Sequence, residues 1–526
     1  MGFLASAIRR LPKRPKGIRQ PNMSTGQLPA PTLGLNLKDG LASMKPSDAL
    51  ILDNWFPEAT YCRIRGGYTS HVTGLGAAVQ SLMEWGGPSS RKLFGATPTA
   101  IYDVTAAGAV GAAVVSGLGS GYWSTVNITT AGGAFMVLAN GVDSVRNYDG
   151  TSWTTPAITN VTSSTLDFVT SHKSRLWFVQ KNTTKAWYLP TSSIAGAAVA
   201  FELGERFTDG GKLVGIGSVS RDGGSGSDDY LAFVSSHGQV AVFAGDDPAS
   251  ANTWTLVGVY NAAPPVGNRS LANVGGDLAI LTESAIVSTR QLMAGGQAAA
   301  ERQSITIRID QGIQSAFASY GAVTGWSVMV YPRTRQAIFN IPTASTTAFQ
   351  YVVNTQTGAW CSYSGLQATC WGIMSENPYF GTSGGTVYLF ESGYSDAGVA
   401  INTEMKTSFQ SYGNKGALSR VCMVRPIFSA GGRLIPQIKM NMDYRNDQPM
   451  TTDAFPLSNV SIGAVWDTAV WDAAAWGDTE SPYADWFAAT GIGTVASFHM
   501  ITQTNGINAR VNAIDVMFEK SETLAL

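Results

Sequence analysis

Short apolar runs alternate with turn residues through the middle of the chain. Seven segments have the form of a β-hairpin, in which a short apolar strand, a turn rich in Gly, Asn, Asp or Thr and a second strand follow one another. They span residues 92–104, 135–153, 174–190, 230–245, 277–290, 335–353 and 379–392. Their first strands begin about 41 to 59 residues apart, an interval that suits the roughly 40–50 residues of a four-stranded propeller blade. The pattern therefore predicts a β-propeller over residues 75–400.

The pattern changes near residue 400, where the alternating segments become longer. Five of them, at residues 401–413, 419–428, 435–444, 494–503 and 509–519, have the length and alternation of extended strands. Five strands of this kind predict a separate β-sandwich-like domain over residues 401–526.

The beginning of the chain lacks such periodicity. Residues 1–40 contain five prolines and a basic cluster, which predicts an extended arm. In residues 41–74 we expect a short helix from Ser47, which can cap it, to Trp55, because Pro57 would stop it. Residues 61–65 then alternate as a strand that leads into the β domain. The fold class expected for the whole chain is all-β.

Charge is unevenly distributed. The chain of 526 residues has 35 basic and 36 acidic side chains, and six of the basic ones lie within the first 20 residues. The rest of the chain therefore carries a net charge of −7, which argues against general attraction to nucleic acid or to an acidic membrane. Arg9, Arg10, Lys13 and Arg14 are candidate partner-binding residues, since a basic arm can order against an acidic neighbouring surface. The alternative is a solvated tail.

Tryptophans fall into two groups. Several close the turn of a predicted hairpin, where we expect them to pack between blades; these are Trp153, Trp187, Trp254 and Trp360. Trp466, Trp471 and Trp476 recur every five residues, a period that fits neither a helical stripe nor one face of a strand. They are either local core or anchors on a partner surface.

Catalytic and metal-binding patterns are weak. The G-x-S-x-G match at residues 381–385 falls in a hairpin turn, whereas a nucleophile elbow needs a strand before the serine and a helix after it. The four cysteines and four histidines show no metal-ligand spacing. The apolar lead precedes the N-terminal charges, unlike a secretory signal, and no transmembrane run is present. We therefore expect no enzyme activity, no cofactor and no metal.

A family resemblance adds a function. Residues 48–57 (DALILDNWFP), 63–68 (RIRGGY) and 408–420, followed by the Trp-Asp run, resemble the tail nozzle (tail tube) proteins of short-tailed bacteriophages, the podoviruses. The resemblance covers most of the chain. It implies a structural virion protein that forms a homo-hexamer below the head-to-tail adaptor proteins. The hexamer would form the exit channel for double-stranded DNA, dock tail fibres or tailspikes, and face the host cell envelope at its tip.

Localisation in the virion, after assembly in the bacterial cytoplasm, follows from the same resemblance. A nozzle must also hold back packaged DNA, and acidic, Gly-rich loops could do so sterically. Residues 221–229 are the best match, with Asp222, Asp228 and Asp229 as candidate channel-gate residues. An idle surface loop is the alternative for that segment. For the whole protein the competing hypothesis is a carbohydrate-binding or polysaccharide-depolymerising propeller that acts as a receptor-binding protein.

Overall fold

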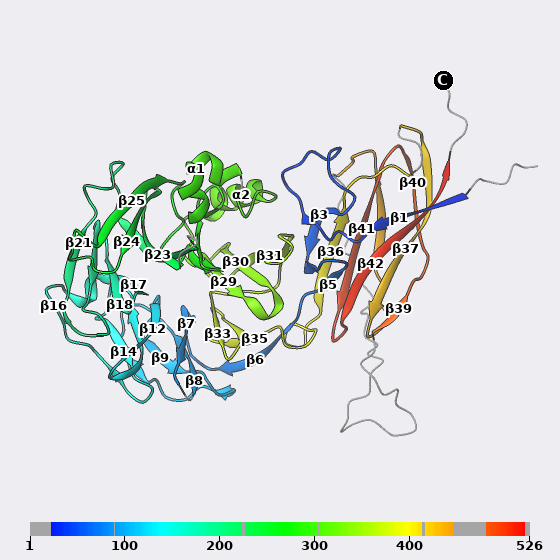
Figure 1. Cartoon of the computed structure of the whole chain (residues 1–526). Helices are drawn as coiled ribbons and strands as arrows, with labels where there is room; N and C mark the ends of the chain where they lie inside the picture. Colours follow the sequence, from blue (N-terminus) through cyan, green and yellow to red (C-terminus); the bar gives the residue numbers. More distant parts are fainter. Residues whose placement is uncertain are drawn as a thin grey trace, which may run out of the picture.

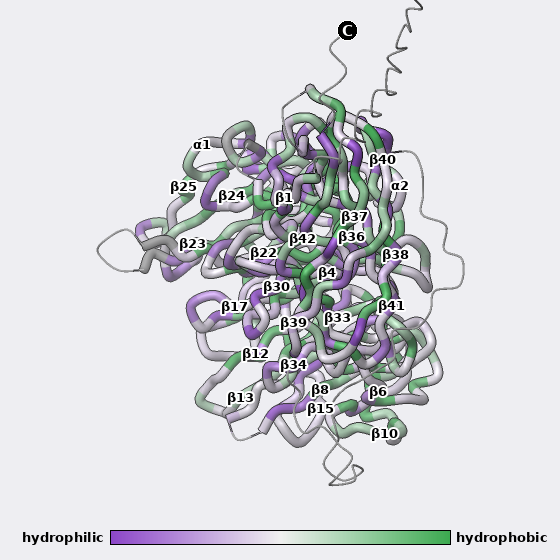
Figure 2. The backbone as a smooth tube through the Cα atoms, turned by 90° about the vertical axis from the view of Figure 1, so that its right-hand side faces the viewer, coloured by the Kyte–Doolittle hydropathy of each residue, from purple (hydrophilic) through white to green (hydrophobic). Residues whose placement is uncertain are grey.

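The structure is a computed structural model that describes residues 23–88, 90–222, 227–302, 304–412, 416–446 and 480–520. These residues form two β regions that lie side by side (Figure 1). In this described part of the chain, two α-helices and two 3-10 helices accompany 42 strands. The all-β prediction is therefore confirmed. Hydrophobic and hydrophilic residues are interspersed along the backbone (Figure 2).

The first region, called here the seven-sheet region, consists of antiparallel sheets that follow one another along the chain. The first two sheets are β7 (Ser81–Gly86), β8 (Arg91–Ala96), β9 (Ala100–Asp103) and β11 (Val115–Ser116), then β12 (Ser124–Thr130), β13 (Gly133–Ala139), β14 (Arg146–Tyr148) and β15 (Trp153–Thr154). The third and fourth are β17 (Leu166–His172), β18 (Arg175–Gln180), β19 (Lys185–Tyr188) and β21 (Val199–Glu202), then β22 (Leu213–Asp222), β23 (Ser227–Ser235), β24 (Gln239–Gly245) and β25 (Trp254–Asn261).

The remaining three sheets differ in the number of their strands and in the segments that complete them. The fifth has three strands, β26 (Leu271–Val274), β27 (Asp277–Leu281) and β28 (Ile286–Ser288). The sixth is β29 (Ser327–Tyr331), β30 (Gln336–Pro342), β31 (Ala348–Asn354) and β32 (Trp360–Tyr363). The seventh is β33 (Cys370–Met374), β34 (Asn377–Gly381), β35 (Val387–Phe390) and β6 (Tyr68–Thr73), with β10 (Gly108–Ala109) beside β6. Because β6 precedes the first sheet in the chain, an early segment completes the last sheet.

Short elements fill the connections. A parallel pair, β16 (Ile158–Thr159) and β20 (Gly196–Ala197), lies beside the second and third sheets. Helices α1 (Thr289–Arg302) and α2 (Asp310–Tyr320) connect the fifth sheet to the sixth, and the 3-10 turns are η1 (Ser163–Thr165) and η2 (Pro332–Thr334). No helix of the described chain has the length and apolar content needed to cross a membrane.

The seven sheets contact one another in cyclic order. Their first strands, β7, β12, β17, β22, β26, β29 and β33, each contact the next, and β33 contacts β7 again. A hydrophobic cluster lies between each pair of consecutive sheets. One of these clusters stacks Trp177 on Trp254, with ring centroids 5.7 Å apart. Burial of apolar surface is thus spread over repeated sheet-to-sheet contacts. Within the described residues no sheet closes on itself.

The second region, called here the two-sheet region, combines strands from both ends of the described chain. One sheet contains β4 (Trp55–Pro57), β5 (Cys62–Ile64), β42 (Ala509–Lys520), β37 (Ser419–Ala430) and β39 (Ser481–Tyr483), with β1 (Met23–Pro29) beside β42 and β40 (Phe487–Gly493) beside β37. The facing strands are β2 (Gly34–Leu35), β3 (Asp48–Asp53), β36 (Ile401–Thr407), β41 (Ala496–Thr504) and β38 (Gln437–Met442), and their sheet continues into the sixth sheet through β32. The two sheets share one hydrophobic cluster.

Each predicted hairpin lies in a different sheet of the seven-sheet region, and the five long strands predicted after residue 400 are β36, β37, β38, β41 and β42. The short helix predicted from Ser47 to Trp55 is wrong, because Asp48–Asp53 forms β3. There β3 pairs with β2 on one side and β36 on the other, and Leu52 is fully buried. Hydrogen bonding of β3 to strands on both sides favours the strand over the helix that the capping residue Ser47 predicts.

The predicted boundaries at residues 40, 74 and 400 do not coincide with the spatial regions. Residues 23–29 of the predicted arm form β1, which pairs with β42 over seven residue pairs. The described part of the predicted arm therefore belongs to the same region as the C-terminal strands. Pairing between β1 and β42 brings these distant segments together.

Candidate functional site

The residues that carry the family resemblance meet at the junction of the two regions. Asn54, Trp55 and Phe56 belong to or adjoin β4, and Arg65 follows β5. Trp55 and Phe56 are fully buried in the cluster that contains residues of the sixth and seventh sheets and of both facing sheets. The NWFP segment is therefore a buried connection between the two β regions.

Arg65 is the centre of this junction. Its guanidinium is fully buried and pairs with Asp396 through two contacts, Nη1–Oδ1 at 2.8 Å and Nη2–Oδ2 at 2.6 Å. It also donates to Asn54 Oδ1 at 2.8 Å and to the Ser364 carbonyl at 3.0 Å. A buried ion pair is tolerated only when its remaining hydrogen-bonding capacity is satisfied, and here it is. Nη1 also donates to the Gly66 carbonyl at 3.0 Å, and the four partners lie up to 331 residues from Arg65 in the sequence.

The glycines of the RIRGGY segment allow the chain to pass this point. A Cβ on Gly67 would collide with the backbone of Ser395, and a Cβ on Gly66 would lie 2.8 Å from the Glu391 Cα. Only glycine fits at such close approaches of backbone to backbone. The segment after Phe390 is thereby held against the start of β6.

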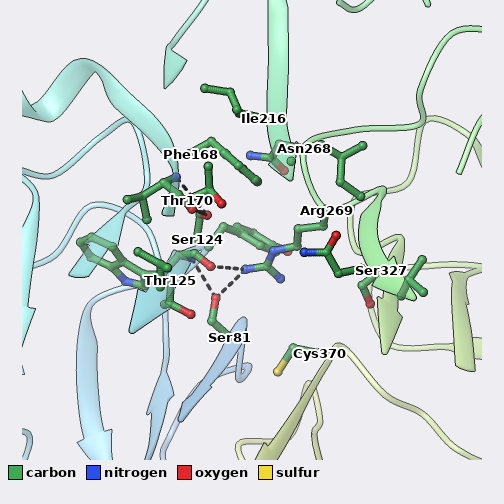
Figure 3. Close-up of a pocket in the computed structure, with 18 of the residues that line it drawn as sticks. Ser81, Ser124, Thr125, Phe168, Thr170, Ile216, Asn268, Arg269, Ser327 and Cys370 are labelled. Atoms are coloured by element: carbon green, nitrogen blue, oxygen red, sulfur yellow. Dashed lines mark hydrogen bonds between the residues drawn. The ribbon is translucent and has the colours of Figure 1, made fainter. Parts of the chain in front are cut away.

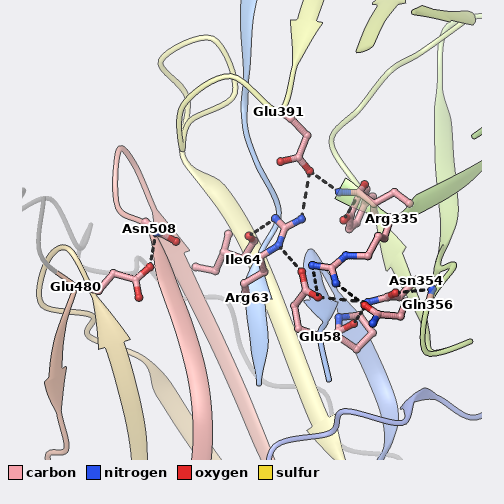
Figure 4. Close-up of polar contacts among 12 residues, drawn as sticks. Glu58, Arg63, Ile64, Arg335, Asn354, Gln356, Glu391, Glu480 and Asn508 are labelled. Carbon is pink, nitrogen blue, oxygen red and sulfur yellow. Dashed lines mark hydrogen bonds and ion pairs between the residues drawn. The ribbon is translucent and has the colours of Figure 1, made fainter. Parts of the chain in front are cut away.

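A second polar network surrounds the β4–β5 turn (Figure 4). Arg63 Nε donates to Glu58 Oε1 at 3.3 Å, and Arg63 Nη2 lies 3.7 Å from Glu391 Oε1. Asn354 of β31 donates to the Pro57 carbonyl at 3.0 Å, and Gln336 of β30 donates to Glu391 at 2.7 Å. The network connects the β4–β5 turn with the sixth and seventh sheets. Both junction sites connect residues of the two regions.

A cavity of about 320 Å³ lies where the seven first strands converge (Figure 3). Residues of β7, β12, β17, β22, β26, β29 and β33 all line it. Its wall is a mixture of aromatic rings, aliphatic side chains and neutral Ser, Thr and Asn groups. Such a mixture is typical of ligand pockets in this size range.

Arg269 carries the one charge among the described residues that line this cavity. It lies in the connection between β25 and β26, and its guanidinium is drawn in the middle of the cavity in Figure 3. Nη1 donates to the Gln80 carbonyl at 2.8 Å, and Nη2 donates to Ser81 Oγ at 2.5 Å and to the Trp123 carbonyl at 3.3 Å. The guanidinium also lies over the Tyr122 ring, 5.1 Å from its centroid. All of these partners are neutral.

A second cavity, of about 440 Å³, adjoins the first and shares Tyr122, Asn268 and Arg269 with it. Asp167 and Lys181 line this second cavity. Asp167 Oδ1 is buried without a hydrogen-bond partner in the described structure. Burial raises the pKa of Asp167 to about 6, although Lys181 and Lys212 act in the opposite direction.

No sequence motif points to Arg269, yet one signal is present. It is the single charged residue between Asp247 and Asp277. An isolated charge in a long neutral stretch points to a specific contact, but nothing in the sequence alone tells which strands surround it.

Most site residues proposed from the sequence lie outside the described residues, namely Arg9, Arg10, Lys13, Arg14, Trp466, Trp471 and Trp476. The acidic gate candidates are placed differently from the expected loop. Asp222 ends β22, while Asp228 and Asp229 belong to β23, with Asp222 opposite Ser227 in the register of this hairpin. They are strand residues at the end of a hairpin, and their role as a gate stays a prediction.

The turn at Ser383 and the tryptophans of the predicted hairpins match their structural interpretation. Ser383 of the G-x-S-x-G match lies in the turn between β34 and β35, as predicted. Trp254 and Trp360 are buried, and Trp153 and Trp187 pack against inter-sheet clusters. Among the residues searched, which are those the structure describes, no group of three or more His, Cys, Asp or Glu side chains could hold a metal ion.

Comparisons with known proteins give only distant similarity. No protein-family model matches the chain, and no curated protein matches it. A solved structure of a computationally designed protein, Ika8, is 12% identical with a TM-score of 0.34, over 61% of this chain and 99% of that one. An exo-beta-1,3-galactanase from Phanerochaete chrysosporium, solved with galactose, is 8% identical with a TM-score of 0.24, over 75% of this chain and 95% of that one. Similarity this weak carries no argument about function.

Proposed function

We propose that the chain is a structural virion protein, a subunit of a hexameric tail nozzle of a short-tailed bacteriophage. In this proposal six copies surround the exit channel for double-stranded DNA below the head-to-tail adaptor, dock fibres or spikes, and catalyse no reaction. The resemblance of residues 48–57 and 63–68 supports it, and the role of these residues at the buried junction explains why a two-region subunit would need them. The net charge of −7 over residues 21–526 also suits a channel that must release DNA.

The proposal also includes the architecture of each of the two regions. We propose that the seven-sheet region is a seven-bladed β-propeller and that the two-sheet region is a β-sandwich. The cyclic contact order of the seven first strands and the hydrophobic clusters between consecutive sheets support the first assignment. The shared core of the two facing sheets supports the second.

The observation that carries the assembly proposal is a pair of open sheet edges in the two-sheet region. In the described structure β1 pairs only with β42, and β40 pairs only with β37, although β40 also packs against β38 of the facing sheet. Neither strand contains a charged residue, and Met23 and Ile492 on them are 42% and 65% exposed. Proteins that stay monomeric usually protect such edges with charges, which both strands lack, or with bulges and prolines, of which β40 has one bulge and β1 has Pro29 at its end. Open edges on opposite sides of one sheet fit head-to-tail association, which closes into a ring when the rotation allows.

Both edges also adjoin the segments that the sequence singled out for partner binding. The basic arm directly precedes β1, and Trp476 lies five residues before β39, which neighbours the β40 edge. Cations and tryptophans beside open edges are suited to reinforcing a contact made by strand pairing. In the proposed ring the β40 edge of one subunit faces the β1 edge of the next.

Charge placed on these edges tests the proposal. Purified wild-type chain is expected to form six-fold rings in electron micrographs and hexamers in mass photometry. Ile492→Lys and Met23→Lys should each leave a folded subunit that no longer assembles, because a lysine on the edge opposes strand pairing. Val399→Lys is the matched control, since Val399 is 67% exposed but lies outside both edge strands.

Two results would contradict the proposal. A wild-type chain that stays monomeric up to its solubility limit would contradict the hexamer, and rings that persist in both edge variants would exclude these edges as the contact. Release of sugar from a bacterial surface polysaccharide by the isolated subunit would instead favour the receptor-binding alternative.

A further inference from the structure

The central cavity contains a partly buried cation with no counter-ion among the described residues that line it. The described residues that line it include no Asp or Glu, and the closest candidate for a thiolate, Cys370, stays protonated because burial raises its pKa to about 11. Burial also lowers the pKa of Arg269, but an arginine remains charged at neutral pH. A charge that is partly withdrawn from water is costly unless it is paired, so the guanidinium of Arg269 favours the binding of an anion beside it.

Hydrogen-bond donors remain free at the same place. The contacts of Arg269 use three of the five N–H groups of its guanidinium within the described structure. The side-chain amides of Asn268 and Asn273, two exposed residues at the cavity lining, make no hydrogen bond to another described protein group. The Ser327 hydroxyl at the cavity wall is buried without a partner as well. Free donors and one uncompensated positive charge therefore converge on one space.

We propose that this cavity binds a small organic acid with one carboxylate, which accepts hydrogen bonds from Arg269 and from the amides of Asn268 and Asn273. The neutral part of the molecule packs against Tyr122, Phe168 and Trp371, which line the same space. This inference does not rest on the nozzle assignment, because it concerns the interior of a single subunit.

The single positive charge of Arg269 favours a monoanion over a dianion as the ligand of this cavity. One guanidinium compensates one negative charge, so a phosphate dianion would keep a second charge that no described side chain of the cavity pairs. A carboxylate also accepts charge-assisted hydrogen bonds from the remaining N–H groups of the guanidinium, and such bonds are stronger than those between neutral groups. The aromatic and hydroxyl groups of the wall suit a polar but uncharged remainder, such as the ring of an acidic sugar.

Glucuronate and glucose are the matched probes, because they differ mainly in the carboxylate. Isothermal titration of the full chain at pH 7 and constant ionic strength is expected to show binding of glucuronate and none of glucose. Arg269→Gln should weaken glucuronate binding about 10- to 100-fold through loss of charged hydrogen bonds. Arg175→Gln is the control, since Arg175 is an arginine of the same region that lines neither cavity and pairs with Asp247.

The proposal is overturned if wild type binds glucuronate no more tightly than glucose, or if Arg269→Gln binds it as wild type does. Equal binding of inorganic phosphate would overturn the preference for a monoanion. Should Arg269→Gln fail to fold, Asn273→Ala takes its place, because the Asn273 amide supports no described protein contact and its loss should still weaken glucuronate binding. Unchanged binding in that variant would count against the site.

Discussion

The two β regions are built by opposite routes. Every sheet of the seven-sheet region is assembled chiefly from neighbouring hairpins, so that β22 to β25 follow one another without interruption. The two-sheet region instead joins β1 to β42, a pairing across almost the entire chain. Local pairing places the hydrophobic clusters between successive sheets, whereas long-range pairing collects residues from both chain ends into one cluster. The difference indicates that the two regions should respond differently to the loss of a single contact.

The largest expected effect is at the junction, where the two routes meet. Arg65→Ala should destabilise the protein by about 3–5 kcal/mol, because it leaves the Asp396 carboxylate buried without its partner. Calorimetry should show the loss in the unfolding of both regions, since Arg65 contacts segments of each.

Arg425→Ala is the matched control for that measurement. Arg425 pairs with Asp515 at 2.5 Å entirely within the two-sheet region, and its side chain is 36% exposed. A loss of similar size in both variants, or a loss in Arg65→Ala confined to one region, would show that the junction does not couple the regions.

The same comparison explains what the sequence could predict. Hairpins of the seven-sheet region were identified because strand, turn and strand are adjacent, and the alternation of β37 and β42 was visible for the same reason. The local sequence of a strand does not indicate a pairing partner that lies hundreds of residues away. For this reason the sequence predicts an arm where β1 lies and a helix where β3 lies. The Arg65–Asp396 pair and the Arg269 cavity were missed because both depend on segments that only the fold brings together.

A smaller effect is expected from two titrating residues of β17 in the seven-sheet region. Burial lowers the pKa of His172 to about 4, and its surroundings include Lys173, Asp229 and Asp246. Stability from His172 is therefore lost as the pH falls from 6.5 to 4, because the unfolded chain binds the proton first. Asp167, with its pKa raised to about 6, has the opposite sign: its contribution is lost as the pH rises from 3.8 to 6.

These two contributions should nearly cancel in the wild type between pH 4 and 6. As the pH rises from 4 to 6, the free energy of unfolding of Asp167→Asn should increase relative to wild type by about 1–2 kcal/mol after solvent screening. That of His172→Gln should decrease relative to wild type by a similar amount. Urea unfolding at pH 4, 5 and 6 measures the difference. Parallel pH profiles for wild type and both variants would contradict this account of β17.

The smallest effect, and the most direct comparison of the two regions, comes from removing one methyl group in each. Ile280 of β27 and Ile514 of β42 are both fully buried, and Ile→Val at such sites costs about 0.5–1.5 kcal/mol. Hydrogen exchange followed by mass spectrometry should show faster exchange in Ile280→Val only near the fourth and fifth sheets, which share its cluster. In Ile514→Val exchange should rise in β1, β5 and β37 together, because these strands border β42 although the chain separates them. Unchanged protection of β1 in Ile514→Val would mean that long-range pairing does not make this region one cooperative unit.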